Sequence, residues 1–242
     1  MDAIRTEGLC KQYGRVTAVK DLSLTVREGE IFSLLGVNGA GKTTTVKMLS
    51  CLTAPTAGDA YLLGHSITQE AQTVKSFIAV SPQETAVAPN LSVRENLSLI
   101  GGLHGFSREE LEKRIADASA RLGLSSVLDR RAGKLSGGWA RRLSIAMALI
   151  SDPKILFLDE PTLGLDVLAR SELWEIVRAL RGRVTVILTT HYMEEAEALS
   201  DRIAIMRDGR LLACDTAAGL KAAAGTDRFE EAFIRIVKGV EP

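Results

Sequence analysis

Short apolar runs separated by turn signals predict that the first third of the chain forms strands. A turn at Glu28-Gly29 precedes the most continuous of these runs, which leads into a group of glycines. After Thr43, apolar residues return at a spacing compatible with a helix. The order strand, glycine-rich loop, helix is therefore expected here. The predicted strands are residues 3–9, 16–26 and 31–35.

The middle of the chain changes to a helical pattern. Ser92 with Glu95, and Ser107 with Glu110, match the capping box that satisfies free backbone N–H groups at the start of a helix. We therefore expect a helical insert over about residues 86–150. The apolar residues that recur three or four apart, as on one helix face, are Leu111, Ile115, Ala118 and Leu122.

Beyond this insert, short apolar strands alternate with helical segments, which predicts a parallel sheet. The whole pattern indicates one α/β domain, in which about 1–85 and 151–242 form a core with a strand-rich part and about 86–150 a helical part. The expected elements are a strand at 155–158, a helix through Trp174 and Val177, a strand at 184–188, a helix at 193–200 and a hairpin of 203–206 with 211–214.

Large apolar side chains fall on one helical face near the end of the chain. These residues are Phe229, Phe233, Ile236 and Val237. Two interpretations are open. The helix packs on the main domain, which is the commoner arrangement, or its face is a docking surface for another chain.

Composition bounds these interpretations. A chain of 242 residues is long for one domain and short for two, which favours a single core with an inserted or appended part. Thirty basic residues balance thirty acidic ones, and a net charge of zero is not typical of a nucleic-acid-binding protein. We therefore expect no nucleic-acid partner.

Cysteine use and hydropathy favour a cytoplasmic protein. Cys10, Cys51 and Cys214 are far apart and lack metal-site spacing, which fits buried thiols in a reducing compartment. The N-terminus has no signal-peptide pattern, and polar residues at 151–154 interrupt the most apolar region, 143–158. If the protein works at a membrane, another chain is expected to anchor it.

The strongest chemical signal is GVNGAGKTT at residues 36–44, which matches the phosphate-binding pattern G-x-x-x-x-G-K-[ST]. Glycines let the backbone N–H groups of such a loop converge on phosphate oxygens, and the following helix adds its partial positive end. A chance match is disfavoured because the loop lies between a predicted strand and helix. The expected nucleotide-binding residues are Gly36, Asn38, Gly39, Ala40, Gly41, Lys42, Thr43 and Thr44.

Two further motifs add a catalytic carboxylate and a second anion-binding loop. The strand of ILFLDE at 155–160 ends at Asp159, which is placed to face magnesium held by Thr43, and at Glu160, which is placed to polarise water. Taken alone, such a pair is often a surface feature. LSGGW at 135–139 offers Ser136 as a helix cap, with bare N–H groups at Gly137 and Gly138.

In this order, the motifs resemble those of the nucleotide-binding subunits of ABC transporters, over nearly the whole chain. The resemblance implies a P-loop NTPase core with a mostly parallel sheet, an N-terminal antiparallel β subdomain and an inserted α-helical subdomain. Four further residues match the family: Tyr13 (adenine stacking), Gln83 (magnesium and attacking water), Asp166 (the D-loop) and His191 (the γ-phosphate). Taken singly, they could also be, in the same order, a turn aromatic, a polar loop residue, a helix cap and a histidine at a strand end.

The resemblance also implies ligands, partners and a place of work. ATP and Mg²⁺ are the cofactors, with Thr43, Gln83 and Asp159 at the metal and Glu160, His191 and Gln83 in catalysis. Two such domains close over two ATP molecules, as a homodimer or with a similar chain. A separate transmembrane permease holds the subunit at the inner face of the membrane and contacts the segment ETAVAPNL after Gln83. The compact chain looks most like exporter subunits of the ABC-2 class, which include drug-resistance ATPases.

Two stretches of the chain depart from the family's usual residues. Trp139 stands where the family usually has glutamine, and TLGLDV at 162–167 has apolar residues at positions that are more often polar or proline. Since the serine and the glycine backbone make the phosphate contacts, we expect retained function.

A soluble ABC-type ATPase acting on nucleic acid or ribosomes is disfavoured, because the chain lacks a second ATPase domain and a long coiled coil. The signature loop disfavours a P-loop kinase, and the intact Glu160 disfavours a catalytically silent subunit.

Overall fold

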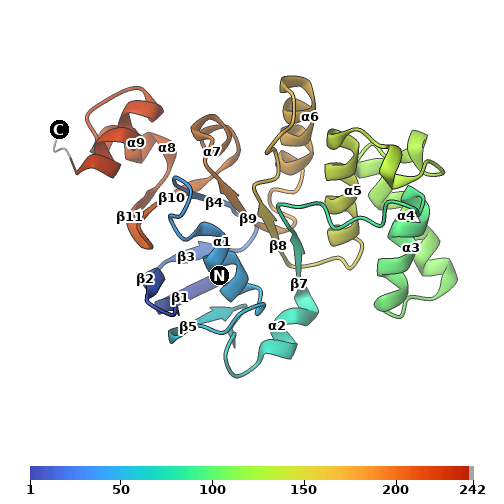
Figure 1. The fold of residues 1–242 in the computed structure, drawn as a ribbon, viewed down its shortest axis with the longest axis horizontal. Helices are drawn as coiled ribbons and strands as arrows, with labels where there is room; N and C mark the ends of the chain where they lie inside the picture. The colour runs from blue at the N-terminus through green and yellow to red at the C-terminus, as the bar shows by residue number, and fades with distance from the viewer. Residues whose placement is uncertain (240–242) are drawn as a thin grey trace.

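The computed structural model describes residues 1–239, which form two sheets surrounded by helices (Figure 1). The larger sheet has the strand order β11-β10-β4-β9-β8-β7. All its strands are parallel except β11, which is the antiparallel arm of a hairpin with β10. Its strands are β4 (Ile31–Leu35), β7 (Ile78–Ser81), β8 (Ile155–Asp159), β9 (Thr185–Thr190), β10 (Arg202–Arg207) and β11 (Arg210–Asp215).

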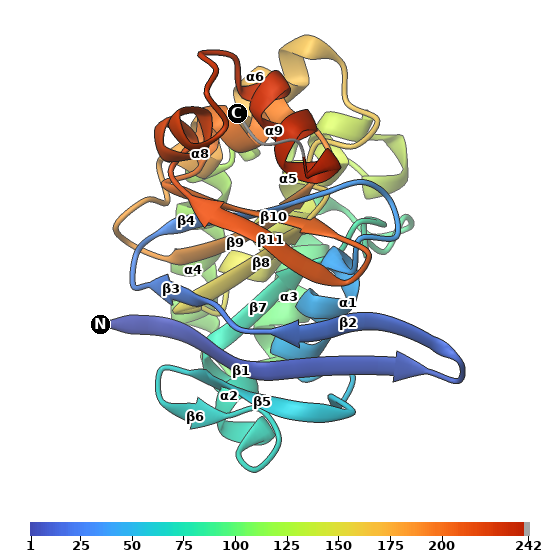
Figure 2. The same cartoon turned by 90° about the vertical axis from the view of Figure 1, so that its left-hand side faces the viewer.

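The smaller sheet is antiparallel and lies below the larger one in Figure 2. Its long strand β1 pairs with β2, β3 and β5, and β6 extends β5. These strands are β1 (Asp2–Tyr13), β2 (Val16–Leu22), β3 (Thr25–Arg27), β5 (Ala57–Leu62) and β6 (His65–Ser66). The mostly parallel core sheet and the N-terminal antiparallel sheet are confirmed.

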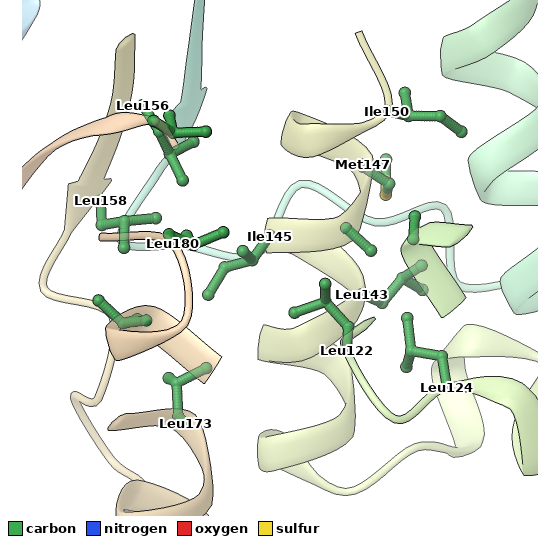
Figure 3. Packing of buried hydrophobic residues seen from close by; sticks show 14 of the residues in the cluster. Leu122, Leu124, Leu143, Ile145, Met147, Ile150, Leu156, Leu158, Leu173 and Leu180 are labelled. Carbon is green, nitrogen blue, oxygen red and sulfur yellow. The ribbon is translucent and has the colours of Figure 1, made fainter. Parts of the chain in front are cut away.

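Alternation along the central strands explains how both faces of the larger sheet are covered. Phe32, Leu34 and Phe157 point into one apolar cluster, where helix α1 (Lys42–Leu49) lies between the two sheets (Figures 1 and 2). Leu156 and Leu158 point the opposite way, towards the helices of the other face (Figure 3). A parallel sheet buried on both faces needs continuous apolar strands, and β4 and β8 are fully buried.

The helices of the middle segment pack together at one end of the molecule (Figure 1). The capping box at Ser92 and Glu95 is confirmed, with both hydrogen bonds present. At the next helix only half of the expected box forms. Ser107 accepts from the N–H of Glu110, but the Glu110 carboxylate pairs instead with Arg114. The helices are α3 (Val93–Leu103), α4 (Arg108–Arg121) and α5 (Gly137–Leu149), with short 3-10 turns at Ser125–Val127 and Ala132–Lys134.

The predicted apolar face of α4 packs inward. Ile115, Ala118 and Leu122 are buried in the cluster that includes Leu143 of α5, and Leu111 packs against it (Figure 3 shows Leu122 and Leu143). The same cluster continues through Ile145 to Leu156 and Leu158 of β8. The division of the chain into subdomains at about residues 86 and 150 stays a prediction.

The remaining helices connect and cover the core. The helix at the end of the chain, α9, packs on α7, α8, β10 and β11, and Phe229 and Phe233 are buried there. The packed-helix interpretation therefore describes α9, although Ile234 remains exposed. These helices are α2 (Ala71–Phe77), α6 (Val167–Arg178), α7 (Met193–Leu199), α8 (Ala217–Ala223) and α9 (Phe229–Lys238).

No membrane-spanning helix and no disulfide is found among the described residues. Within residues 1–239, every helix is too short or too polar to cross a bilayer. The three cysteines are free and half-buried, and burial raises the pKa of the Cys51 and Cys214 thiols.

Candidate functional site

The glycine-rich loop joins β4 to α1 and has little room to move. Gly41, the residue before α1, has a φ of 100°, and a Cβ there would lie 2.5 Å from the carbonyl oxygen of Ala18. A Cβ on Gly36 would lie 2.4 Å from the carbonyl oxygen of Met206. Only glycine fits at these two positions, because a side chain would meet backbone atoms of β2 and β10.

Lys42 opens α1 and turns its side chain back along the loop. Its Nζ donates to the carbonyl oxygen of Gly36 at 2.7 Å and lies 3.4 Å from Oε1 of Glu160. The side chain is 5% exposed, so its charge is held inside the cleft. The loop and the end of β8 therefore meet at one buried cation.

The carboxyl end of β8 places two acids side by side. Oδ1 of Asp159 accepts hydrogen bonds from the hydroxyls of Thr43, at 3.1 Å, and Thr189. Thr189 belongs to the neighbouring strand β9, so its hydroxyl fixes the Asp159 carboxylate relative to the sheet. The carboxylate and the Thr43 hydroxyl are hard oxygen donors of the kind Mg²⁺ prefers.

Glu160 follows Asp159 in a left-handed conformation, with a φ of 49°. This conformation is rare for a non-glycine residue and turns the side chain away from the line of the strand. Its N–H donates to Thr189, and its Oε2 lies 2.7 Å from Nδ1 of His191. Glu160 is 6% exposed, which suits a carboxylate that must accept a proton from a single water.

Lys42, Thr43, Glu160 and His191 line one cleft of about 740 Å³, large enough for a nucleotide. Three sources form its wall: the glycine-rich loop, strand β2 and the turn between β10 and β11. Gln83 and Leu163 complete the rim. The predicted site residues that it brings together are Asn38, Gly39, Ala40, Gly41, Lys42, Thr43, Thr44, Gln83, Glu160 and His191.

The residues fit magnesium only as a partial ligand set. No group of three or more His, Cys, Asp or Glu side chains able to hold a metal occurs in residues 1–239. Thr43 and Asp159 would supply two oxygens, and nucleotide phosphates and water would supply the rest, as is usual for Mg²⁺. Gln83 lies exposed on the rim of the same cleft.

Seven predicted site residues are not part of the cleft wall. Gly36 and Asp159 contact it through Lys42 and Thr43, and the other five lie further away. Tyr13, at the end of β1, is 47% exposed and has the Lys11 ammonium 5.0 Å from its ring centre. Asp166 caps α6 by accepting from the N–H of Ala169, and its D-loop role stays a prediction. The remaining three, Ser136, Gly137 and Gly138, lie at the start of α5, among the middle helices.

The signature loop (residues 135–139) is an open helix start. Ser136 caps α5 by position, but its hydroxyl makes no capping hydrogen bond, so it is free to bind a ligand. Trp139 packs half-buried against the core cluster, and the Arg142 guanidinium lies 5.1 Å from its ring centre. The tryptophan therefore supports the loop from the protein side and leaves the serine and glycines accessible.

Sequence reasoning missed two charged residues near the site. Glu195 on α7 is fully buried, and burial raises the pKa of its carboxyl although the indole N–H of Trp174 donates to it. Arg141 on α5 is 5% exposed and donates to the carbonyl oxygens of Pro82 and Gln83. The only sequence signal was a charged residue at an otherwise apolar helical position.

Comparison with known proteins agrees with these motifs. The ABC transporter family model matches residues 19–163. The daunorubicin/doxorubicin resistance ATP-binding protein of Streptomyces peucetius is 43% identical over 226 residues, covering 93% of this chain and 68% of that protein. The doxorubicin resistance ATP-binding protein of Mycobacterium tuberculosis is 42% identical, covering 99% and 73%. The Nod factor export ATP-binding protein I of Paraburkholderia xenovorans is 43% identical, covering 87% and 70%.

Solved structures show the same fold. An ATP-binding subunit of an ABC transporter has a TM-score of 0.86 at 26% identity and covers 97% of this chain and 99% of its own. A dimeric ATP-binding cassette in a post-hydrolysis state, bound to ADP and phosphate, has a TM-score of 0.79 at 26% identity. That match covers 88% of this chain and 98% of its own.

Proposed function

Because the chain belongs to the ATP-binding subunits of ABC transporters, most like those of drug exporters of the ABC-2 type, we propose that it drives export by ATP-dependent dimer closure. The chain is an ATPase of this family. In our proposal, two copies close over two ATP molecules and transmit this motion to a separate transmembrane permease. The permease would hold the subunit at the inner face of the membrane.

The cleft supplies the groups that bind the triphosphate. Residues 38–44 line the cleft at the start of α1, where the helix end attracts anions. Lys42 adds a buried positive charge that can leave the Gly36 carbonyl for phosphate oxygens. Thr43 and Asp159 would hold Mg²⁺, which when bound neutralises phosphate charge and orients the γ-phosphate.

Hydrolysis is assigned to Glu160. Its carboxylate accepts a proton from water as the water oxygen bonds to the γ-phosphorus and the bond from that phosphorus to the ADP oxygen breaks. His191, 2.7 Å from Oε2 of Glu160, holds the carboxylate and offers its other ring nitrogen to the phosphate. Gln83 on the rim is assigned to the attacking water and the metal.

One observation carries the dimer proposal: the signature loop lies outside the cleft of its own chain. Its free Ser136 hydroxyl and the start of α5 form a second place for an anion, yet the cleft wall contains none of its residues. In an antiparallel pair, this loop of one copy would close the cleft of the other. Each ATP would then join both copies, so ATP stabilises the closed dimer and hydrolysis releases it.

The test is the oligomeric state of a Glu160→Gln variant, measured by gel filtration with light scattering, with and without Mg-ATP. The variant is expected to bind ATP, to hydrolyse it about a hundredfold or more slowly, and to become a dimer only with Mg-ATP. Glu194→Gln, an acid-to-amide change on the outer helix α7, is the matched control and should behave as wild type.

A Glu160→Gln variant that binds Mg-ATP yet stays monomeric, while wild type hydrolyses ATP, would overturn symmetric closure. It would favour a dissimilar ATPase chain as the partner. If the wild-type chain did not hydrolyse ATP, the assignment of the catalytic site would be wrong.

A further inference from the structure

Helix α5 is attached directly to the loop that carries Gln83. Arg141, one turn after the signature glycines, donates from one guanidinium nitrogen to the carbonyl oxygen of Pro82 at 2.6 Å. A second nitrogen of the same side chain donates to the carbonyl oxygen of Gln83. One planar side chain therefore holds two successive peptide groups at the start of the glutamine loop (residues 82–91), a geometry that a lysine cannot reproduce.

The attachment is buried and repeated one turn later. Arg141 is 5% exposed, and its guanidinium carries the positive charge near Asp159 and Glu195. Burial lowers the pKa of Arg141, while the carboxylates of Asp159 and Glu195 act against that shift. Ser144 lies 3.0 Å, hydroxyl to hydroxyl, from Ser81 at the end of β7. A buried cation is kept only where it is well paired, so this position is built around the contact.

The far end of the glutamine loop is held by a different residue. The Asn96 side chain accepts from the N–H of Ala88 at 2.8 Å and donates to its carbonyl oxygen at 3.1 Å. Asn96 is fully buried on α3. The loop is thus fastened at both ends to the middle helices, and Gln83 lies beside the Arg141 end.

We propose that Arg141 is a positioning residue that holds the backbone at Pro82 and Gln83, so that the Gln83 side chain reaches the cleft, and that ties Gln83 to the signature loop. Gln83 and the signature loop then move together with α5. Closure of the signature loop on a partner would shift Gln83 in the chain's own cleft. This inference rests on the proposed function for its catalytic consequence, but the backbone contact itself can be tested independently.

The first experiment measures hydrogen–deuterium exchange of the nucleotide-free chain by mass spectrometry. Arg141→Met keeps the length and removes the donors, and amides of residues 83–86 are expected to exchange about tenfold or more faster. Amides of residues 87–91, held by Asn96, should change little. Arg142→Met, which changes the neighbouring arginine that pairs with Glu172 of α6 instead, is the matched control and should leave exchange at residues 83–86 unchanged.

The second experiment is a double-mutant cycle on ATP turnover with Gln83→Ala. Arg141→Met alone is expected to lower kcat about tenfold or more with little change in ATP affinity. In the Gln83→Ala background it should lower kcat less than threefold, because the residue through which it acts is gone. Arg141→Lys can reach one carbonyl and should fall between wild type and Arg141→Met; it replaces Arg141→Met if that variant does not fold.

Faster exchange at residues 83–86 together with a non-additive cycle supports the proposal. Unchanged exchange overturns it, whatever the turnover. Faster exchange with an additive cycle also overturns it, because Arg141 would then be only a structural support. A wild-type chain without ATP hydrolysis would refute the proposed function, and the exchange experiment would still decide whether Arg141 holds the loop.

Discussion

At the scale of single residues, Lys42 occupies the most constrained position in the cleft. Its ammonium is shared between the Gly36 and Val37 carbonyls and the Glu160 carboxylate, and the side chain is buried. A phosphate can replace these partners and is a stronger one, because both charges are then desolvated and hydrogen-bonded.

Lys42→Met is therefore expected to weaken ATP binding by about ten- to a hundredfold, the value of one charge-assisted hydrogen bond. Isothermal titration calorimetry gives the dissociation constant. Lys47→Met changes an exposed lysine of the same helix and should bind ATP as wild type does. Equal affinities for the two variants would contradict a phosphate-binding role for Lys42.

Glu195 gives a prediction about pH. Its folded-state pKa is raised from 4.5 mainly by burial, so the stability contributed by the protonated carboxyl is present below 4.5. That stability is lost as the pH rises through the folded-state pKa. Within residues 1–239, Oε2 of Glu195 has no hydrogen-bond partner, so ionisation would leave a buried charge that is only partly compensated.

Glu195→Gln removes this titration. The melting temperature of the variant, relative to wild type, should rise as the pH increases from 4.5 towards neutrality. Thermal unfolding between pH 4 and pH 8 measures the difference. Glu197→Gln, on the same helix but exposed, should show no such trend. A constant difference between the Glu195→Gln and wild-type melting temperatures would show that Glu195 does not titrate in this range.

The site was predictable where one motif fixes both residue type and spacing. GKTT and LDE each carry their chemistry within a few residues, so Lys42, Thr43, Asp159 and Glu160 could be named from the sequence. Arg141 could not, because its partners are backbone carbonyls about sixty residues earlier and any side chain can supply a carbonyl.

At the scale of elements, α9 shows how the apolar face of one helix contributes to the stability of the fold. Phe229 and Phe233 fill the cluster formed with α7, α8 and the β10–β11 hairpin, so the stripe stabilises the fold. Phe233→Ala is expected to lower the free energy of unfolding by about 3 kcal/mol or more through the cavity it leaves.

Urea denaturation measures that loss. Ile234→Ala, the next residue along α9, removes a side chain that is 41% exposed and should cost about 0.5 kcal/mol or less. Equal costs for the two variants would indicate that α9 is not packed as described.

Elements were predictable where the pattern was local. The helix start at Ser92 needs only four residues, and both bonds formed as expected. By contrast, β6 has two residues, and β5 is a strand because it pairs with β1, about fifty residues earlier. At Ser107, the Glu110 side chain had a nearby arginine, Arg114, and this stronger ion pair replaced the second half of the capping box.

At the scale of the whole molecule, a composite site predicts complementation between two inactive variants. Lys42→Met disables the cleft, and Ser136→Arg fills the signature loop with a bulky cation. In a mixed dimer, one site combines both lesions and the other has an intact cleft facing an intact signature loop. Mixing equal amounts should restore about a quarter of wild-type ATPase activity, since half of the dimers are mixed and carry one intact site.

The measurement is phosphate release from the mixture compared with each variant alone. A mixture of Lys42→Met with a second cleft variant, Thr43→Ala, is the control, because no mixed dimer of that pair has an intact cleft. Activity no greater than the sum of the two variants would argue against a site shared between copies.

The sheet order also belongs to this scale. The sequence predicted several parallel strands, but β4 lies between β9 and β10, which follow it by about 150 residues or more. Periodicity reports which face of a strand is buried and says nothing of its neighbours. The order follows from the packing of α1 on one face and the middle helices on the other, which only the folded chain reveals.

The crowding around Gly36 and Gly41 has a thermodynamic consequence. Since backbone atoms of β10 and β2 crowd Gly36 and Gly41, the two ends of the loop lose their conformational entropy when the chain folds and not when nucleotide binds. The backbone at these two positions then needs little rearrangement when phosphate binds, while the Lys42 side chain exchanges its carbonyl partners for phosphate oxygens. The slow steps of a transport cycle would then lie in the approach and separation of whole domains, and not in the glycine-rich loop.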